Sequence, residues 1–112
     1  MLNEQILRNQ KDFKKVYKKG KSKSDRLIVV LYVKNNFSYS RIAFLASKKV
    51  GNSVKRNRAK RLMKQAFKNL EIELKEGYDI IFIARNTIND TKCYEVEKSI
   101  KNAISRTKEL RK

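Results

Sequence analysis

The chain has 112 residues, which is enough for one domain with a single modest core and too few for two. Lysine and arginine number 29 against 11 acids, and the formal net charge of +18 attracts polyanions, nucleic acid first and an acidic membrane surface second. One cysteine and no histidine exclude a disulfide framework and a Cys/His zinc site, and they favour a reducing, cytoplasmic setting.

The first twenty residues predict a short helix without a targeting signal before it. MLNEQILRNQ lacks the apolar stretch of a signal peptide, and no later apolar run approaches the ~18 residues that a membrane span requires, so we expect no membrane partner. In NQKDFKKVYKKG, Asn9 suits an N-cap and Gly20 suits the end of a helix. Phe13, Val16 and Tyr17 form an apolar stripe at helical spacing between them.

The following segments predict two strands, a long helix, a third strand and a last helix. RLIVVLYV (26–33) and RIAFLAS (41–47) are β-rich runs joined by the loop KNNFSYS, and together they favour an antiparallel hairpin. A long helix is then predicted by apolar positions at helical spacing, namely Ala59, Leu62, Met63, Ala66, Phe67 and Leu70. A buried-type strand over 80–84 follows Gly77, and YEVEKSIKNAISRTKEL (94–110) predicts the last helix. This order indicates a single α+β domain over 1–112, a two-layer α/β sandwich with helices covering a small sheet.

The long helix has a strongly basic face opposite its apolar stripe, formed by Asn57, Arg61, Lys64 and Lys68. A merely solvated face usually mixes charges of both signs, whereas no acid occurs between Asp25 and Glu71. Lys55 and Arg56 also place positive charge in the first turn, where the helix dipole is already positive. A bound phosphate would relieve both conflicts, and the preceding GNS offers a cap and free N–H groups for an anion.

Other chemistry is scarce in this sequence. We find no nucleophile–base pair and no metal-binding cluster, so we name no catalytic and no metal-ligating residue. Phe13 and Tyr17 allow two interpretations. They are core residues of the first helix, or an aromatic pair among lysines that stacks on single-stranded RNA.

Four segments together resemble the protein component of bacterial ribonuclease P: DFKKVYKKGKS, SKKVGNSVKRNRAKRLMKQAF, YDIIFIAR and YEVEKSI, in that family's order and spacing. The resemblance implies an α/β sandwich with a left-handed crossover, against the usual right-handed rule. The crossover runs from the second strand through the helix that contains the RNR motif, Arg56-Asn57-Arg58, to the third strand. It also implies that an RNA subunit performs the Mg²⁺-dependent removal of the 5′ leader from precursor tRNA. The protein would then bind that RNA subunit and the leader, and no obligatory protein partner is evident.

The resemblance also implies two groups of binding residues. RNA-subunit binding falls to Lys48, Lys49, Asn52, Lys55, Arg56, Asn57, Arg58, Lys60, Arg61, Lys64 and Lys68. Leader binding falls to Phe13, Lys14 and Tyr17 in a cleft between the first helix and the sheet, with a strand residue that is Tyr32 or Leu31 depending on register; we assign Tyr32. The chain departs from the family at Ala43, where many members have glycine, which affects packing at the sheet.

Two other classes of nucleic-acid-binding protein compete with this interpretation. A structural RNA-binding protein, such as a ribosomal protein, accounts equally well for the small size and the basic excess. A DNA-binding repressor would read bases with short polar side chains, whereas this helix carries mostly lysine and arginine, which suit phosphates. The ribosomal alternative is distinguished by substrate, because it gains no affinity from a tRNA leader.

Overall fold

The structure is a computed structural model that describes residues 5–111. Its elements in chain order are β1 (Gln5–Ile6), α1 (Gln10–Lys19), β2 (Lys21–Ser24), β3 (Ile28–Lys34), β4 (Arg41–Ala46), α2 (Ser53–Leu70), β5 (Tyr78–Ala84), the 3₁₀ turn η1 (Asn86–Ile88) and α3 (Cys93–Ser105). The strands form one five-stranded sheet in the order β1-β4-β5-β3-β2. Within the described range, no helix combines the length and the apolar character that crossing a membrane demands.

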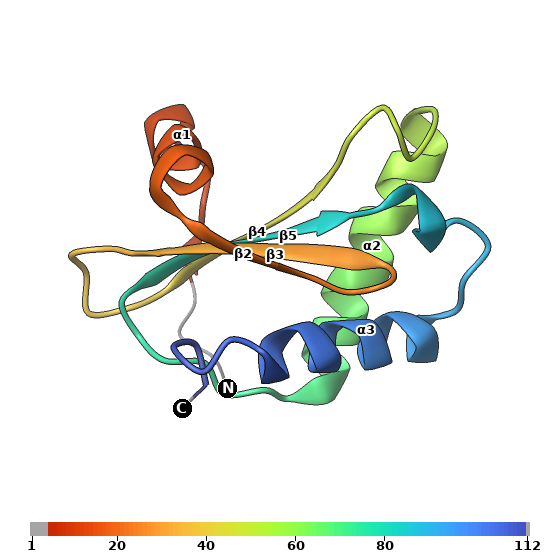
Figure 1. Cartoon of the computed structure of the whole chain (residues 1–112). Coiled ribbons are helices and arrows are strands. Elements are labelled where there is room, and N and C mark those ends of the chain that lie inside the picture. The colour runs from red at the N-terminus through yellow and green to blue at the C-terminus, as the bar shows by residue number, and fades with distance from the viewer. Residues whose placement is uncertain (1–4, 112) are drawn as a thin grey trace.

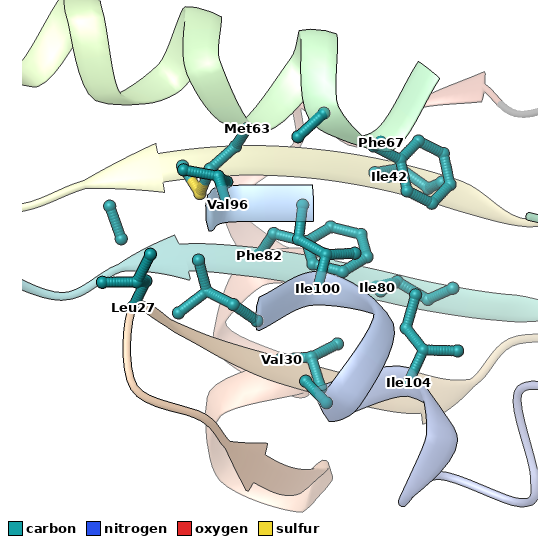
Figure 2. Packing of buried hydrophobic residues seen from close by; sticks show 14 of the residues in the cluster. Leu27, Val30, Ile42, Met63, Phe67, Ile80, Phe82, Val96, Ile100 and Ile104 are labelled. Atoms are coloured by element: carbon teal, nitrogen blue, oxygen red, sulfur yellow. The ribbon is translucent and has the colours of Figure 1, made fainter. Parts of the chain in front are cut away.

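Helices lie on both faces of the sheet. Figure 1 shows α1 above one face, and α2 and α3 packed on the other. The main core lies on the α2 and α3 side, where Met63 and Phe67 of α2, Phe82 of β5 and Ile100 of α3 pack together (Figure 2). A smaller cluster lies under α1 and contains Leu7, Val16, Ala43 and Ile81. The α+β class predicted from the element order is confirmed.

The predicted hairpin of 26–33 with 41–47 is wrong, because β5 lies between the two strands. β5 pairs antiparallel with β3 and parallel with β4, so the chain crosses from β4 through α2 to a neighbouring parallel strand. A short loop between two apolar runs favours a hairpin locally. Here the long-range pairing of β5, most of whose side chains are buried, decides the order instead.

Two strands were not predicted, because neither has a strand-like pattern. β1 has two residues and pairs with the start of β4. β2 has the sequence KSKS, with every residue exposed, and it pairs along the outer side of β3. Lysines on an edge strand are common because they discourage further strand pairing.

Caps and one tight turn define the helix boundaries. Asn9 caps α1 by accepting a hydrogen bond from the Lys11 N–H at 2.9 Å, as predicted. Gly20 ends α1 where a Cβ would lie 2.3 Å from the Val16 carbonyl oxygen and 2.9 Å from that of Tyr32, so only glycine fits. The last helix ends at Ser105, before the predicted 110, and Arg106 caps it.

Candidate nucleic-acid interface

The α2 helix separates its apolar and basic residues as its periodicity predicted. Its buried residues are Ala59, Met63, Ala66 and Phe67. The opposite face exposes Asn57, Arg61, Lys64 and Lys68 to solvent. Its first turn contains no acid, and within residues 5–111 no cation of α2 forms an ion pair. This face therefore carries concentrated positive charge that no described carboxylate neutralises.

Arg58 differs from the other cations of α2. Its guanidinium donates a hydrogen bond to the Thr91 carbonyl oxygen at 2.6 Å, which connects α2 to the segment before α3. In the same segment, Asn89 donates from Nδ2 to the Val50 carbonyl oxygen at 2.7 Å. Arg56 and Lys60 are half-buried, so the basic residues of α2 divide into a solvent-facing group and a group that contacts the protein.

The segment before α2 presents Lys48 and Lys49 on a defined turn. The Val50 N–H donates to the Ser47 carbonyl oxygen at 3.0 Å, and the Gly51 N–H donates to that of Lys48 at 3.1 Å. Val50 is buried, which anchors the turn while both lysines stay exposed. Asn52 caps α2, because its side chain accepts from the Lys55 N–H at 3.0 Å.

A second region lies on the sheet face beside α1. Leu31, Ile81 and Ala43 are paired across β3, β5 and β4, so they share one row of this face. Phe13 is half-buried against this apolar cluster, whereas Tyr17 is 54% exposed. The structure thus separates the two aromatic residues that the sequence treated alike.

The placement of Tyr32 beside Phe13 and Tyr17 is wrong, because its side chain lies on the opposite face of the sheet. Tyr32 is 2% exposed in the main core. Its hydroxyl donates to Glu109 at 3.4 Å, and burial raises its pKa above the usual range. Side chains alternate along a strand, so Leu31 takes the position on the α1 side.

A charged network that the sequence did not reveal fixes the start of α1 on the sheet. Arg41 of β4 donates from Nε to Asp79 Oδ1 at 2.8 Å and from Nη2 to Asp79 Oδ2 at 2.6 Å. Its Nη1 donates to Asp12 Oδ2 at 2.9 Å, and the Asp79 carboxylate raises the pKa of Arg41. The one sign of this network in the sequence was Asp12, a lone acid on a lysine-rich helix. Its partner Arg41 lies 29 residues away in the sequence.

The groove between α2 and α3 offers little chemistry. Arg58, Arg61, Leu62, Gln65 and Cys93 line this open groove. Burial raises the pKa of the Cys93 thiol, with a further contribution from Glu97, so the thiol stays protonated near neutral pH. Within the part of the chain that the structure describes, no three cysteine, aspartate or glutamate side chains gather as metal ligands.

Comparisons with known proteins agree on one family. Residues 1–108 match the family model described as Ribonuclease P. The "Ribonuclease P protein component" of Clostridioides difficile (strain 630) is 45% identical over 102 residues, covering 90% of each chain. That of Clostridium botulinum (strain Loch Maree / Type A3) is 42% identical over 106 residues, covering 94% of this chain and 96% of the relative.

Solved structures give the same result at the level of the fold. The Staphylococcus aureus RNase P protein superposes with a TM-score of 0.80 at 32% identity, over 92% of this chain and 94% of that one. The Thermotoga maritima RNase P protein gives a TM-score of 0.78 at 29% identity, over 91% and 96%. With its basic α2 face and this likeness over nearly its whole length, the chain belongs to the family of ribonuclease P protein components.

Proposed function

We propose that the chain uses two surfaces in ribonuclease P, the α2 face to bind the RNA subunit and the α1 side of the sheet to bind the 5′ leader of precursor tRNA. As a protein component of this ribonucleoprotein endoribonuclease, it assists a reaction whose catalytic role lies with the RNA. The observation that carries the proposal is the solvent-facing α2 row, whose cations form no ion pair with a described carboxylate.

Binding of the RNA subunit follows from the arrangement of charge. The exposed cations continue from the turn before α2 along the helix, and they are Lys48, Lys49, Lys55, Arg61, Lys64 and Lys68. Contacts between protein cations and RNA phosphates release counterions and supply much of the binding affinity. They do not depend on the nucleotide sequence. We assign Arg56, Arg58 and Lys60 to the edge of this surface, since they are half-buried, and Asn52 to its support as the cap.

We assign leader binding to the α1 side because an exposed aromatic ring of α1 lies next to the apolar face of the sheet. Tyr17 presents its ring to solvent, and Phe13 lies one helical turn before it, half-buried at the sheet. Lys14 is exposed between them, and we assign Leu31 to the strand position. An aromatic ring stacks on any base, which suits a leader of variable sequence.

We assign the Mg²⁺ that the reaction needs to the RNA subunit, where it would stabilise charge on the phosphate that is cleaved. The chain's own residues bind and orient RNA. We expect the protein in the cytoplasm, where its RNA partners are made.

Reconstitution with a bacterial ribonuclease P RNA tests the proposal. We expect the protein alone to leave precursor tRNA intact and the mixture to remove the leader at physiological Mg²⁺. The control is the RNA subunit without protein at the same Mg²⁺ concentration. Cleavage by protein freed of all RNA, or no gain in rate on mixing, would contradict the proposal.

The leader separates this function from that of a structural RNA-binding protein. We expect the reconstituted enzyme to bind precursor tRNA more tightly than the same tRNA without its leader. A ribosomal-type protein would show equal affinity for both. The comparison therefore tests the cleft independently of the RNA-subunit surface.

A further inference from the structure

One side of α1 carries a row of lysines that the proposed function does not use. Lys11, Lys15, Lys18 and Lys19 follow i, i+4, i+7, i+8 spacing, which places them on one side of the helix. All four are exposed, and Val16, which packs on the sheet, lies outside this row. We call these four residues the lysine flank.

The lysine flank lacks acids to balance it. Asp12 is the one acid of α1, and its carboxylate accepts a hydrogen bond from Arg41. Within residues 5–111 no lysine of the flank forms an ion pair. Like charges at i, i+4 destabilise a helix, as at Lys11 with Lys15 and Lys15 with Lys19. A bound polyanion would reverse this effect.

An exposed aromatic residue lies next to this part of α1. Arg41, which binds Asp12, also lies over the Phe37 ring at 4.7 Å from its centroid. Phe37 stacks on Tyr39 with ring centroids 5.2 Å apart and an angle of 18°. Phe37 is 46% exposed. It belongs to the loop 35–40, which extends from the end of the sheet near α1 (Figure 1). We call Phe37 and Tyr39 the aromatic pair.

Hydrogen bonds define the shape of this loop. The Phe37 N–H donates to Asn35 Oδ1 at 2.8 Å, and Asn35 Nδ2 donates to the Tyr39 carbonyl oxygen at 3.3 Å. Asn35 Nδ2 also donates to Asp79 Oδ1 at 2.9 Å, within the network that includes Arg41. The loop, the start of α1 and the sheet are therefore connected through one set of contacts. A preformed site loses little conformational entropy on binding.

We propose that the lysine flank and the aromatic pair bind single-stranded RNA, and that this RNA is the part of the leader upstream of the nucleotides in the cleft. The inference rests on the proposed function. Phe13 and Tyr17 lie on one side of α1 and the lysine flank lies toward the other, so a strand that leaves the cleft over a helix about 10 Å wide reaches the flank. Lysines beside an exposed aromatic ring, here that of Phe37, are the combination that binds single strands without sequence preference.

Leaders of graded length test this site in the reconstituted enzyme. Three tRNA substrates are compared. One has no leader, one has a leader of about five nucleotides that fills the cleft, and one has a leader of about twelve that extends beyond it. The variants are K11Q/K15Q/K18Q and F37L, where leucine keeps apolar bulk in place of the ring. The matched control is K98Q/K101Q/K108Q, which removes three exposed lysines from α3 and the segment after it. Thermal melting shows that each variant is folded.

We expect the wild type to gain affinity from the short leader and more from the long one. K11Q/K15Q/K18Q should lose the second gain, about tenfold, and should reduce its salt slope by about 2 if about three phosphates are released. F37L should lose about fivefold or more of the same gain. Both variants should keep the gain from the short leader.

Three results would overturn the inference. These are a wild type that gains nothing from the longer leader, variants that keep the whole second gain, and a control that loses as much as K11Q/K15Q/K18Q. Failure of the proposed function looks different, because then the short leader adds nothing over leaderless tRNA. The lysine flank is judged only on the difference between the long and the short leader.

Discussion

Single side chains decide how α1 lies on the sheet. Asp79 is 1% exposed, and its carboxylate is paired through both oxygens with Arg41. The third nitrogen of the same guanidinium reaches Asp12, next to Phe13. Arginine suits this position because its planar group donates in several fixed directions, which lysine cannot do. The position of the proposed leader site therefore depends on Arg41, which is not one of the residues assigned to the cleft.

Replacing Arg41 should destabilise the fold. Arg41→Ala leaves the buried Asp79 carboxylate without its cation, and we expect a loss of about 3 kcal/mol in the free energy of unfolding. Arg41→Lys should lose less, because it keeps the charge but not the paired geometry. Urea denaturation measures both, with exposed Lys34→Ala as control. A loss below about 1 kcal/mol for Arg41→Ala would show that the network contributes little to stability.

Tyr17 offers a clean test of leader binding because it is largely exposed. Tyr17→Ala should leave thermal stability nearly unchanged and weaken binding of precursor tRNA by about 1 to 3 kcal/mol, since a stacking contact is lost. Binding of leaderless tRNA should not change. Phe13→Ala should affect both stability and leader binding, because that ring also packs on the sheet. Equal losses for tRNA with and without a leader would assign Tyr17 another role.

At the scale of elements, α2 combines a core-facing apolar stripe with a solvent-facing basic one. Its buried face packs against β4 and α3, while its opposite face accumulates charge at a cost to helix stability. Arg58 belongs to the basic run of the sequence, but its guanidinium donates to the Thr91 carbonyl oxygen. It is therefore not part of the solvent-facing row. Variants that test RNA binding should therefore use residues without such contacts.

The variant R61Q/K64Q/K68Q isolates the charge of the α2 face. All three residues are exposed and distant from the buried stripe, so the fold should be unaffected. Affinity for the RNA subunit should fall, and the slope of log affinity against log salt should decrease by about 2 if each cation contacts one phosphate. Filter binding at several salt concentrations measures this. An unchanged slope, or an equal change in K98Q/K101Q/K108Q, would mean that the face is merely solvated.

At the scale of the whole molecule, one sheet separates the two proposed surfaces. α2 lies on one face and α1 on the other, so the strands between them set the spacing and orientation of the two proposed RNA-binding surfaces (Figure 1). The net charge of +18 repels itself in the free protein and is neutralised when RNA binds. Stability and RNA affinity should therefore respond to salt in opposite directions.

Salt should raise the melting temperature of the free protein while it weakens RNA binding. Between about 10 mM and 150 mM salt the Debye length falls from about 30 to 8 Å, which screens repulsion between the many cations. K98Q/K101Q/K108Q should gain less from salt, because it starts with less charge. Scanning calorimetry of the RNA-free protein measures the effect. A melting temperature that falls with added salt would show that ion pairs outweigh the repulsion.

The sequence by itself determined the features that depend on neighbouring residues. The boundaries of α1 follow from Asn9 and Gly20, and the split of α2 into apolar and basic faces follows from its period. Only the tertiary structure decided that β5 separates β3 from β4 and that Leu31, not Tyr32, faces α1. These choices depend on contacts between residues far apart in the chain, such as Arg41 with Asp79. Such pairings become favourable only when the whole sheet forms, and no local pattern records them.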